Sequence, residues 1–139
     1  MIMATIEYRK LFRANVCVMV KYKSLAQPKI EGATFSKNLS STGLSVIIKE
    51  RFKEGDGIVL EIFLSEKDKP IISKSKIVWQ RLCTYIPKSQ LRYYSTGIHF
   101  VQMSSQDAIK TSDFITDVLR RQKENEDKAI IDKIESLKF

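Results

Sequence analysis

The 139-residue chain contains few cysteines, glycines and prolines, and it has no long hydrophobic run. Its only cysteines, Cys17 and Cys83, are too few for a disulfide framework or a paired metal-binding knuckle. No apolar stretch approaches the roughly 20 residues that a membrane-spanning helix needs. Residues 1–10 lack the basic-then-apolar order of a secretory signal. We therefore expect a reduced, cytoplasmic protein without a membrane span.

The sequence also lacks the motifs of common enzyme and metal sites. It contains neither a Gly-rich phosphate loop nor a dinucleotide-binding fingerprint, and no pair of carboxylates stands in a convincing catalytic context. His99 is the only histidine, and its spacing from the two cysteines fits neither a metal site nor a nucleophilic pair. We expect no catalytic residues, no metal site and no cofactor, so the predicted protein is not an enzyme.

The net charge of +8 is concentrated in one part of the chain. Residues 1–101 contain 17 Lys or Arg against 8 Asp or Glu, whereas residues 102–139 contain 7 against 8. A basic body favours anionic partners such as nucleotides, nucleic acid or acidic lipid. Charge that serves only solubility would give the same total.

Short runs rich in β-branched and aromatic residues, separated by Gly, Pro and Asn turns, predict six strands. Six strands at this spacing indicate a mainly β fold, an antiparallel barrel or sandwich, because closing the sheet removes its exposed edges. We expect Trp79 to contribute to barrel packing and residues 84–94 to form a loop. The predicted strands are residues 15–22, 34–37, 44–49, 58–64, 71–82 and 97–101.

The pattern changes after residue 103, where a C-terminal α-helix is predicted. Ser104 and Asp107 fit a capping box, with the serine accepting amide hydrogens and the aspartate reaching back. Apolar residues at helical spacing follow and should face the barrel: Ala108, Ile109, Ile115, Val118 and Leu119. Residues 120–128 contain no apolar side chain, which indicates a solvated helix or a linker.

A second apolar patch at the C-terminus contains Ile130, Ile134 and Leu137. It allows two interpretations. The last turn could dock back on the barrel, which we slightly favour, or it could bind a partner or a second copy.

Two polar stretches carry the functional signal. Arg9 and Arg13 stand four residues apart before the first predicted strand, and Asn38, Ser40 and Gly43 mark a turn between two strands. Either stretch alone is common, since such arginines usually mark a solvated face and such turns are widespread. Their order, together with the strands that surround them, is far more specific.

These motifs resemble those of the PilZ family, the receptors for the bacterial second messenger cyclic di-GMP. The resemblance covers residues 8–101 and implies a six-stranded antiparallel PilZ-type β-barrel with a C-terminal helix. The implied organisation is an N-terminal arm at 1–13, the barrel at 14–103 and a helical segment at 104–139. It also implies a protein effector as partner and a role in motility, exopolysaccharide synthesis or virulence.

The implied ligand-binding residues are Arg9, Arg13, Asn38, Ser40 and Gly43, with Lys10 as a possible addition. Arginine suits this ligand because its planar fork can bond a phosphate or a guanine edge and can stack on a purine. We expect the arm to be mobile without ligand and to fold over it, which would present a surface to the partner.

Two other functions stay open. One is a PilZ-like interaction module that has lost ligand binding. The other is a basic β-barrel that binds single-stranded nucleic acid. The sequence disfavours the second, because it lacks exposed aromatics interleaved with basic residues on consecutive strands.

Overall fold

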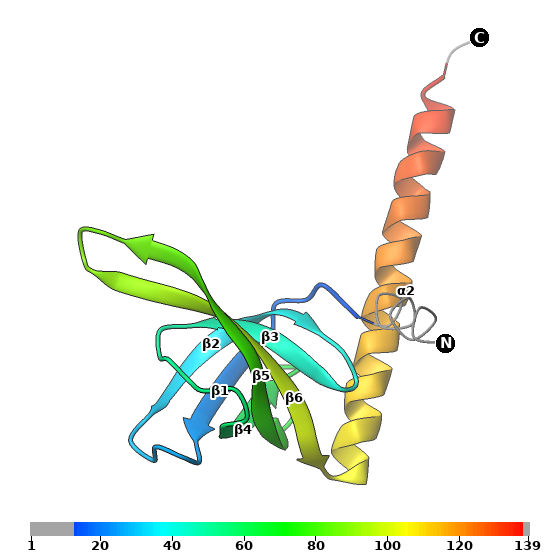
Figure 1. Ribbon diagram of the computed structural model, residues 1–139. Helices are drawn as coiled ribbons and strands as arrows, with labels where there is room; N and C mark the ends of the chain where they lie inside the picture. The colour runs from blue at the N-terminus through cyan, green and yellow to red at the C-terminus, as the bar shows by residue number, and fades with distance from the viewer. Residues whose placement is uncertain (1–12, 138–139) are drawn as a thin grey trace, which may run out of the picture.

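The computed structural model describes residues 13–137 and shows a closed antiparallel barrel followed by one long helix (Figure 1). The predicted fold is therefore confirmed. The barrel order is β1-β2-β3-β6-β5-β4, closed by pairing of β1 with β4. The elements are β1 (Met19–Ser24), β2 (Glu31–Leu39), β3 (Gly43–Ile48), β4 (Gly57–Phe63), β5 (Ile71–Ile86), β6 (Leu91–Met103) and α2 (Ser105–Glu135).

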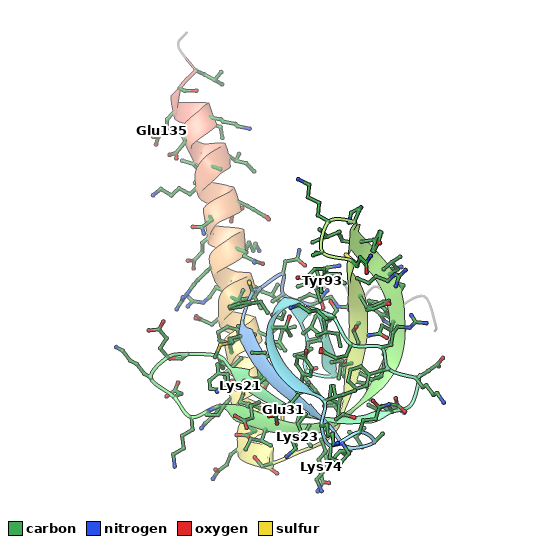
Figure 2. The ribbon with its side chains drawn as sticks, turned by 90° about the vertical axis from the view of Figure 1, so that its left-hand side faces the viewer. Lys21, Lys23, Glu31, Lys74, Tyr93 and Glu135 are labelled. Carbon is green, nitrogen blue, oxygen red and sulfur yellow. The ribbon has the colours of Figure 1, made fainter. Side chains whose placement is uncertain are left out.

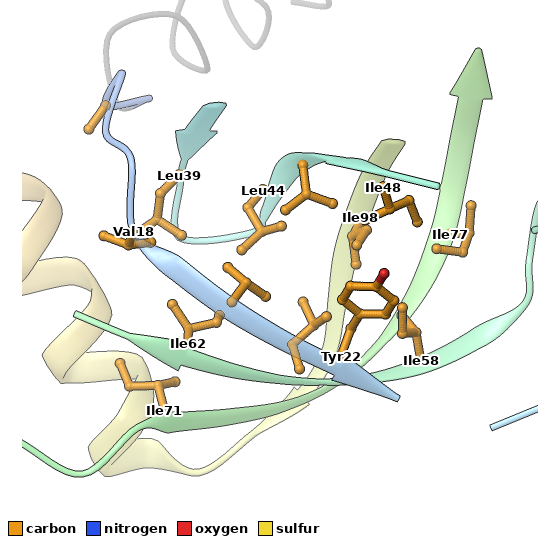
Figure 3. Close-up of a cluster of buried hydrophobic side chains, with 14 of the residues drawn as sticks. Val18, Tyr22, Leu39, Leu44, Ile48, Ile58, Ile62, Ile71, Ile77 and Ile98 are labelled. Atoms are coloured by element: carbon orange, nitrogen blue, oxygen red, sulfur yellow. The ribbon is translucent and has the colours of Figure 1, made fainter. Parts of the chain in front are cut away.

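Aliphatic side chains from every strand fill the barrel interior (Figure 3). Along β4, for example, Ile58, Leu60 and Ile62 are fully buried, while the residues between them are partly exposed. This alternation is what a strand with one face inside a barrel requires. The interior of the barrel is thus built from alternate residues of its strands.

Two strand boundaries differ from the sequence prediction. β1 begins at Met19 rather than at residue 15, because the preceding segment bonds to side chains and single backbone groups instead of a ladder. β2 begins at Glu31 rather than at residue 34, and it pairs with β1 as far as Lys23.

The prediction of a loop over residues 84–94 is wrong. Strands β5 and β6 continue through this region, paired as far as Ile86 and Leu91. Pro87 suggested a loop, yet it lies in the tight turn itself, where Gln90 adopts a positive φ of 56°. The flanking residues are largely β-branched or aromatic, which suits a strand.

Helix α2 begins with half of the expected capping box. The Ser104 hydroxyl accepts a hydrogen bond from the Asp107 amide at 3.1 Å. The Asp107 carboxylate does not reach back; it accepts from the Ile72 amide at 3.2 Å and ties the helix to β5. Ile115 is buried in the core cluster, and Phe114, Val118 and Leu119 pack against that cluster. Ile109 is 62% exposed, so the prediction that it faces the barrel is wrong.

The helix continues without a break to Glu135, so residues 120–128 are a solvated helix and not a linker. Its C-terminal half stands clear of the barrel (Figure 1). Ile130, Ile134 and Leu137 are each more than half exposed. The interpretation that this patch docks on the barrel is therefore wrong, because the straight helix carries it away. No helix within residues 13–137 is long and apolar enough to cross a membrane.

Candidate functional site

One isolated backbone bridge joins the two motif regions. The Ala14 amide donates to the Leu39 carbonyl, and the Leu39 amide donates to the Ala14 carbonyl, each at 2.9 Å. The antiparallel order of this bridge sets Arg13 next to Ser40 at the end of β2. Arg13 is exposed. The structure thus brings together Arg13 and the turn that follows β2, while Arg9 and Lys10 lie outside the described residues.

The turn between β2 and β3 is held by the Ser40 side chain. Its hydroxyl accepts from the amides of Thr42 and Gly43 at 3.3 and 3.2 Å, and it lies 3.2 Å from the Gly43 carbonyl. The Ser40 amide also donates to the Gly43 carbonyl at 2.8 Å. Serine suits this position because its hydroxyl can bond nearby backbone groups. In the described structure, Ser40 therefore shapes the turn.

Gly43 lies against the backbone of β6. A Cβ atom at this position would stand 2.2 Å from the Ile98 carbonyl oxygen, which is backbone and cannot move aside cheaply. Strand packing alone therefore requires glycine here. The implied part of Gly43 in ligand binding stays a prediction.

Asn38 lies at a β-bulge. Strand β2 pairs Ser36 with Val46 but Asn38 with Ser45, so Lys37 is an extra residue and the register shifts. Such a bulge re-aims the side chains beside it. The Asn38 amide oxygen is enclosed, and it accepts no hydrogen bond from residues 13–137. An enclosed, unpaired acceptor is unusual in a folded protein.

A row of four residues crosses the outer wall of the barrel at Asn38. The pairings run from Asn38 to Ser45, from Ser45 to Gly97 and from Gly97 to Trp79. The indole of Trp79 lies over Gly97, since a Cβ there would be 2.2 Å from the indole nitrogen. The ring is 40% exposed, and the guanidinium of Arg81 lies 5.0 Å from its centroid.

Sequence reasoning missed this outward position of Trp79. A bulge between Ile77 and Trp79 shifts the β5 register, so alternation counted along the strand places the ring wrongly. The available signal was Gly97, because a glycine inside a strand often marks close approach of another group.

The surface around the row is basic. Lys37 reaches the Ser95 hydroxyl at 3.4 Å, and the neighbouring row pairs Lys76 with His99, both exposed. No Asp or Glu occurs on any of these strand positions. Among residues 13–137, no group of three or more His, Cys, Asp or Glu side chains could hold a metal ion. The arrangement therefore offers an exposed guanidinium, an amide, a flat ring and positive charge.

The PilZ domain model matches residues 7–117, which is most of the chain. The chain belongs to the PilZ family. No curated protein sequence matches it.

Three solved structures illustrate the likeness of this fold to known proteins. The PilZ domain of YcgR from Escherichia coli with c-di-GMP has a TM-score of 0.62 at 14% identity, covering 84% of this chain and 95% of that one. The Bacillus subtilis inhibitor of motility MotI/DgrA has a TM-score of 0.59 at 20% identity, and the match covers 81% of this chain and 50% of that one. MrkH of K. pneumonia in its apo state has a TM-score of 0.62 at 12% identity, and the match covers 81% of this chain and 51% of that one. This PilZ chain thus spans about half the length of MotI and MrkH.

Proposed function

We propose that this protein is a receptor for cyclic di-GMP, and not an enzyme, with its site formed by Arg9, Arg13 and the turn from Asn38 to Gly43. The observation that carries the proposal is the Ala14–Leu39 bridge, which holds exposed Arg13 beside that turn. Membership of the PilZ family supports the same ligand, as does the presence of c-di-GMP in the YcgR structure.

Each part of the site has a distinct chemical task in this proposal. Arg13 and Arg9 bond phosphate or the guanine edge, because a guanidinium offers a planar fork of donors. The Asn38 amide pairs with a guanine edge, which would satisfy its enclosed oxygen. Trp79 offers a flat, partly exposed ring in the same row. Ser40 and Gly43 keep the turn in shape.

The magnitudes are sufficient for such a ligand. A bidentate arginine–guanine contact is worth about 1–3 kcal/mol, and stacking of a base adds about 1–3 kcal/mol. Micromolar binding requires about −8 kcal/mol in total. Two arginines, one amide and one stacking surface therefore suffice.

We further propose that binding changes the conformation of the arm at residues 1–13 and so signals to a protein partner in the cytoplasm. Arg13 directly precedes the Ala14–Leu39 bridge, so a ligand held between Arg13 and the turn would act on that junction. Amide exchange of residues 5–14 tests the idea. Greater protection with ligand is expected, and identical protection in both states would contradict it.

Calorimetric titration of the full chain with cyclic di-GMP tests the proposed ligand. We expect a saturable heat with micromolar affinity and no comparable heat with GTP. Absence of heat at ligand concentrations of hundreds of micromolar, equivalent to about −5 kcal/mol, would overturn the proposal. The PilZ fold would then serve as an interaction module without this ligand.

A further inference from the structure

Strands β5 and β6 continue beyond the barrel as a two-stranded ribbon, residues 81–94, called here the projecting hairpin. Pairing of β6 with β3 ends at Tyr94, and pairing of β5 with β4 ends at Lys76. Beyond Tyr94, which pairs with Ile48 at its base, the ribbon therefore has no further strand partner among residues 13–137. It leaves the barrel on the side away from α2 (Figure 1), and side chains extend from it into solvent beyond Tyr93 (Figure 2).

Large apolar side chains of the projecting hairpin are exposed. Leu82 is 54% exposed, Tyr85 is 44% and Ile86 is 39%. Ile86 pairs across the ribbon with Leu91, so the tip carries an aliphatic pair beside the turn. Cross-strand pairing places Leu82 and Tyr85 on one face of the ribbon and Ile86 and Leu91 on the other, so exposed apolar side chains flank its end on both faces. Exposed apolar side chains gathered in this way mark a contact site.

The charge of the projecting hairpin has one sign. Arg81, Lys88 and Arg92 are its charged residues, and no Asp or Glu occurs anywhere from residue 69 to residue 106. Two further cations flank its base, where Lys49 lies 5.9 Å from the Tyr93 ring and Arg51 lies 5.0 Å from the Tyr94 ring. This charge favours an anionic partner.

The projecting hairpin combines an aliphatic tip with cations around it, and this combination indicates which class of anionic partner it fits. Nucleic acid offers phosphates and bases, yet the exposed Tyr85 ring already stacks with the Arg92 guanidinium at 5.1 Å, and the aliphatic tip would find no apolar counterpart. A second copy of the same hairpin would be repelled by like charge. An anionic bilayer offers phosphates to the cations and an acyl boundary to the tip.

We propose that the projecting hairpin docks on anionic lipid bilayers. Leu82 and Ile86 enter the boundary between headgroups and acyl chains, while Lys88 and Arg92 bond lipid phosphates. Tyr85 lies at headgroup depth, as amphipathic rings do at membrane interfaces. The contact is peripheral and reversible, because a few apolar side chains and a few cations give only moderate affinity.

Sedimentation of the full chain with vesicles tests the proposal. We expect binding to phosphatidylcholine vesicles containing about one third phosphatidylglycerol, and at least ten-fold weaker binding to phosphatidylcholine alone. Replacing Lys88 and Arg92 together with Gln should weaken binding to the anionic vesicles at least ten-fold, since each cation near the surface contributes about five-fold. The matched control replaces Lys67 and Lys69, exposed in the distant β4–β5 connection, and should retain wild-type binding.

The apolar part of the contact requires its own variant pair. Leu82→Ser with Ile86→Ser should weaken binding to anionic vesicles at least ten-fold, because the acyl contact is lost. Ile131→Ser on α2, where the side chain is 51% exposed, is the control and should bind as wild type. All these side chains are exposed, so the variants should keep the fold, and their circular dichroism should match that of the wild type.

A fluorophore attached to the projecting hairpin measures how deeply the hairpin enters the bilayer. Cys83 is exposed within the hairpin, and Cys17→Ser leaves it as the only thiol. A polarity-sensitive label on Cys83 should shift to the blue with anionic vesicles. Absence of vesicle binding, binding that the hairpin variants do not reduce, or binding without a spectral shift would overturn the proposal. Hairpin-dependent binding of a single-stranded oligonucleotide without vesicle binding would assign the surface to nucleic acid instead.

Discussion

Ala14 and Leu39 exchange two backbone hydrogen bonds of 2.9 Å, although they are far apart in the sequence and neither carries a functional group. This bridge is the point at which the segment before β1 meets the end of β2. It positions Arg13 beside the turn that contains Ser40 and Gly43. The two halves of the proposed site are therefore joined by residues outside the motifs.

Arg13→Ala should weaken cyclic di-GMP binding at least ten-fold and leave the melting temperature of the free protein nearly unchanged. Arg13 is exposed and makes no ion pair within residues 13–137, so its removal costs the fold little. Calorimetry gives the affinity and a thermal melt gives the stability. Arg13→Lys should recover only part of the affinity, because an ammonium lacks the planar fork.

The control for that pair is Lys67→Ala, which removes an exposed cation from the β4–β5 connection and should leave affinity unchanged. A melting temperature that falls by many degrees in Arg13→Ala would mean that Arg13 supports the fold instead of the ligand.

Asn38→Ala should lose at least ten-fold in ligand affinity without losing stability. The enclosed amide oxygen of Asn38 accepts no hydrogen bond within residues 13–137, and such an acceptor costs about 1–3 kcal/mol. Its removal should keep the free energy of unfolding unchanged or raise it by about 1 kcal/mol. Urea unfolding and calorimetry measure the two effects.

Thr34→Val is the matched control on the same strand. The Thr34 hydroxyl donates to the Ile47 carbonyl at 2.5 Å, so this variant should lose about 1 kcal/mol of stability and keep its affinity. If Asn38→Ala behaves like Thr34→Val, the assignment of Asn38 to the ligand fails.

Gly43→Ala should destabilise the free protein by about 1–3 kcal/mol, as overpacking of a tight contact does. The new Cβ would stand 2.2 Å from the Ile98 carbonyl oxygen and force β3 away from β6. In Gly57→Ala, by contrast, the nearest atom would be a flexible Leu25 side-chain carbon at 3.1 Å, so the loss should be smaller. Equal losses in urea unfolding would show that the β3–β6 contact is not what requires Gly43.

The strand count could be predicted because runs of β-branched and aromatic residues between turn residues are a local signal. The boundaries of β2 and the ribbon at residues 84–94 were missed, since Gly32 and Pro87 indicate loops when read locally. In the fold, Gly32 continues a strand that β1 pairs on one side, and Pro87 occupies the turn of a longer hairpin. In both segments, pairing with a neighbouring strand determines the structure, and the local sequence does not show that pairing.

The motif residues could be found from spacing, but their geometry could not. The bulge at Lys37 and the bulge before Trp79 each change which side chains face outward. No residue within either bulge marks it in the sequence, and for Trp79 the signal lies on the facing strand, at Gly97. The same limit applies to Ala14, whose bridge to Leu39 depends on the complete barrel.

Tyr22→Phe should make the stability of the protein less sensitive to alkaline pH. Tyr22 is buried, and its hydroxyl donates to the Glu50 carboxylate. Burial, followed by the hydrogen bond and the charge of Glu50, raises the pKa of Tyr22 well above its ordinary value of about 10. The folded protein therefore keeps this proton where the unfolded chain loses it. The stability that this retained proton contributes is complete below about pH 10 and decreases above it, by up to about 1.4 kcal/mol per pH unit.

Urea unfolding between pH 9 and pH 11 should show this decrease in the wild type and in Tyr85→Phe, an exposed control. Tyr22→Phe should be less stable at neutral pH by about 1–3 kcal/mol, because Glu50 loses its donor, and its stability should fall less steeply. A slope as steep as that of the wild type would show that Tyr22 does not retain its proton in the folded state.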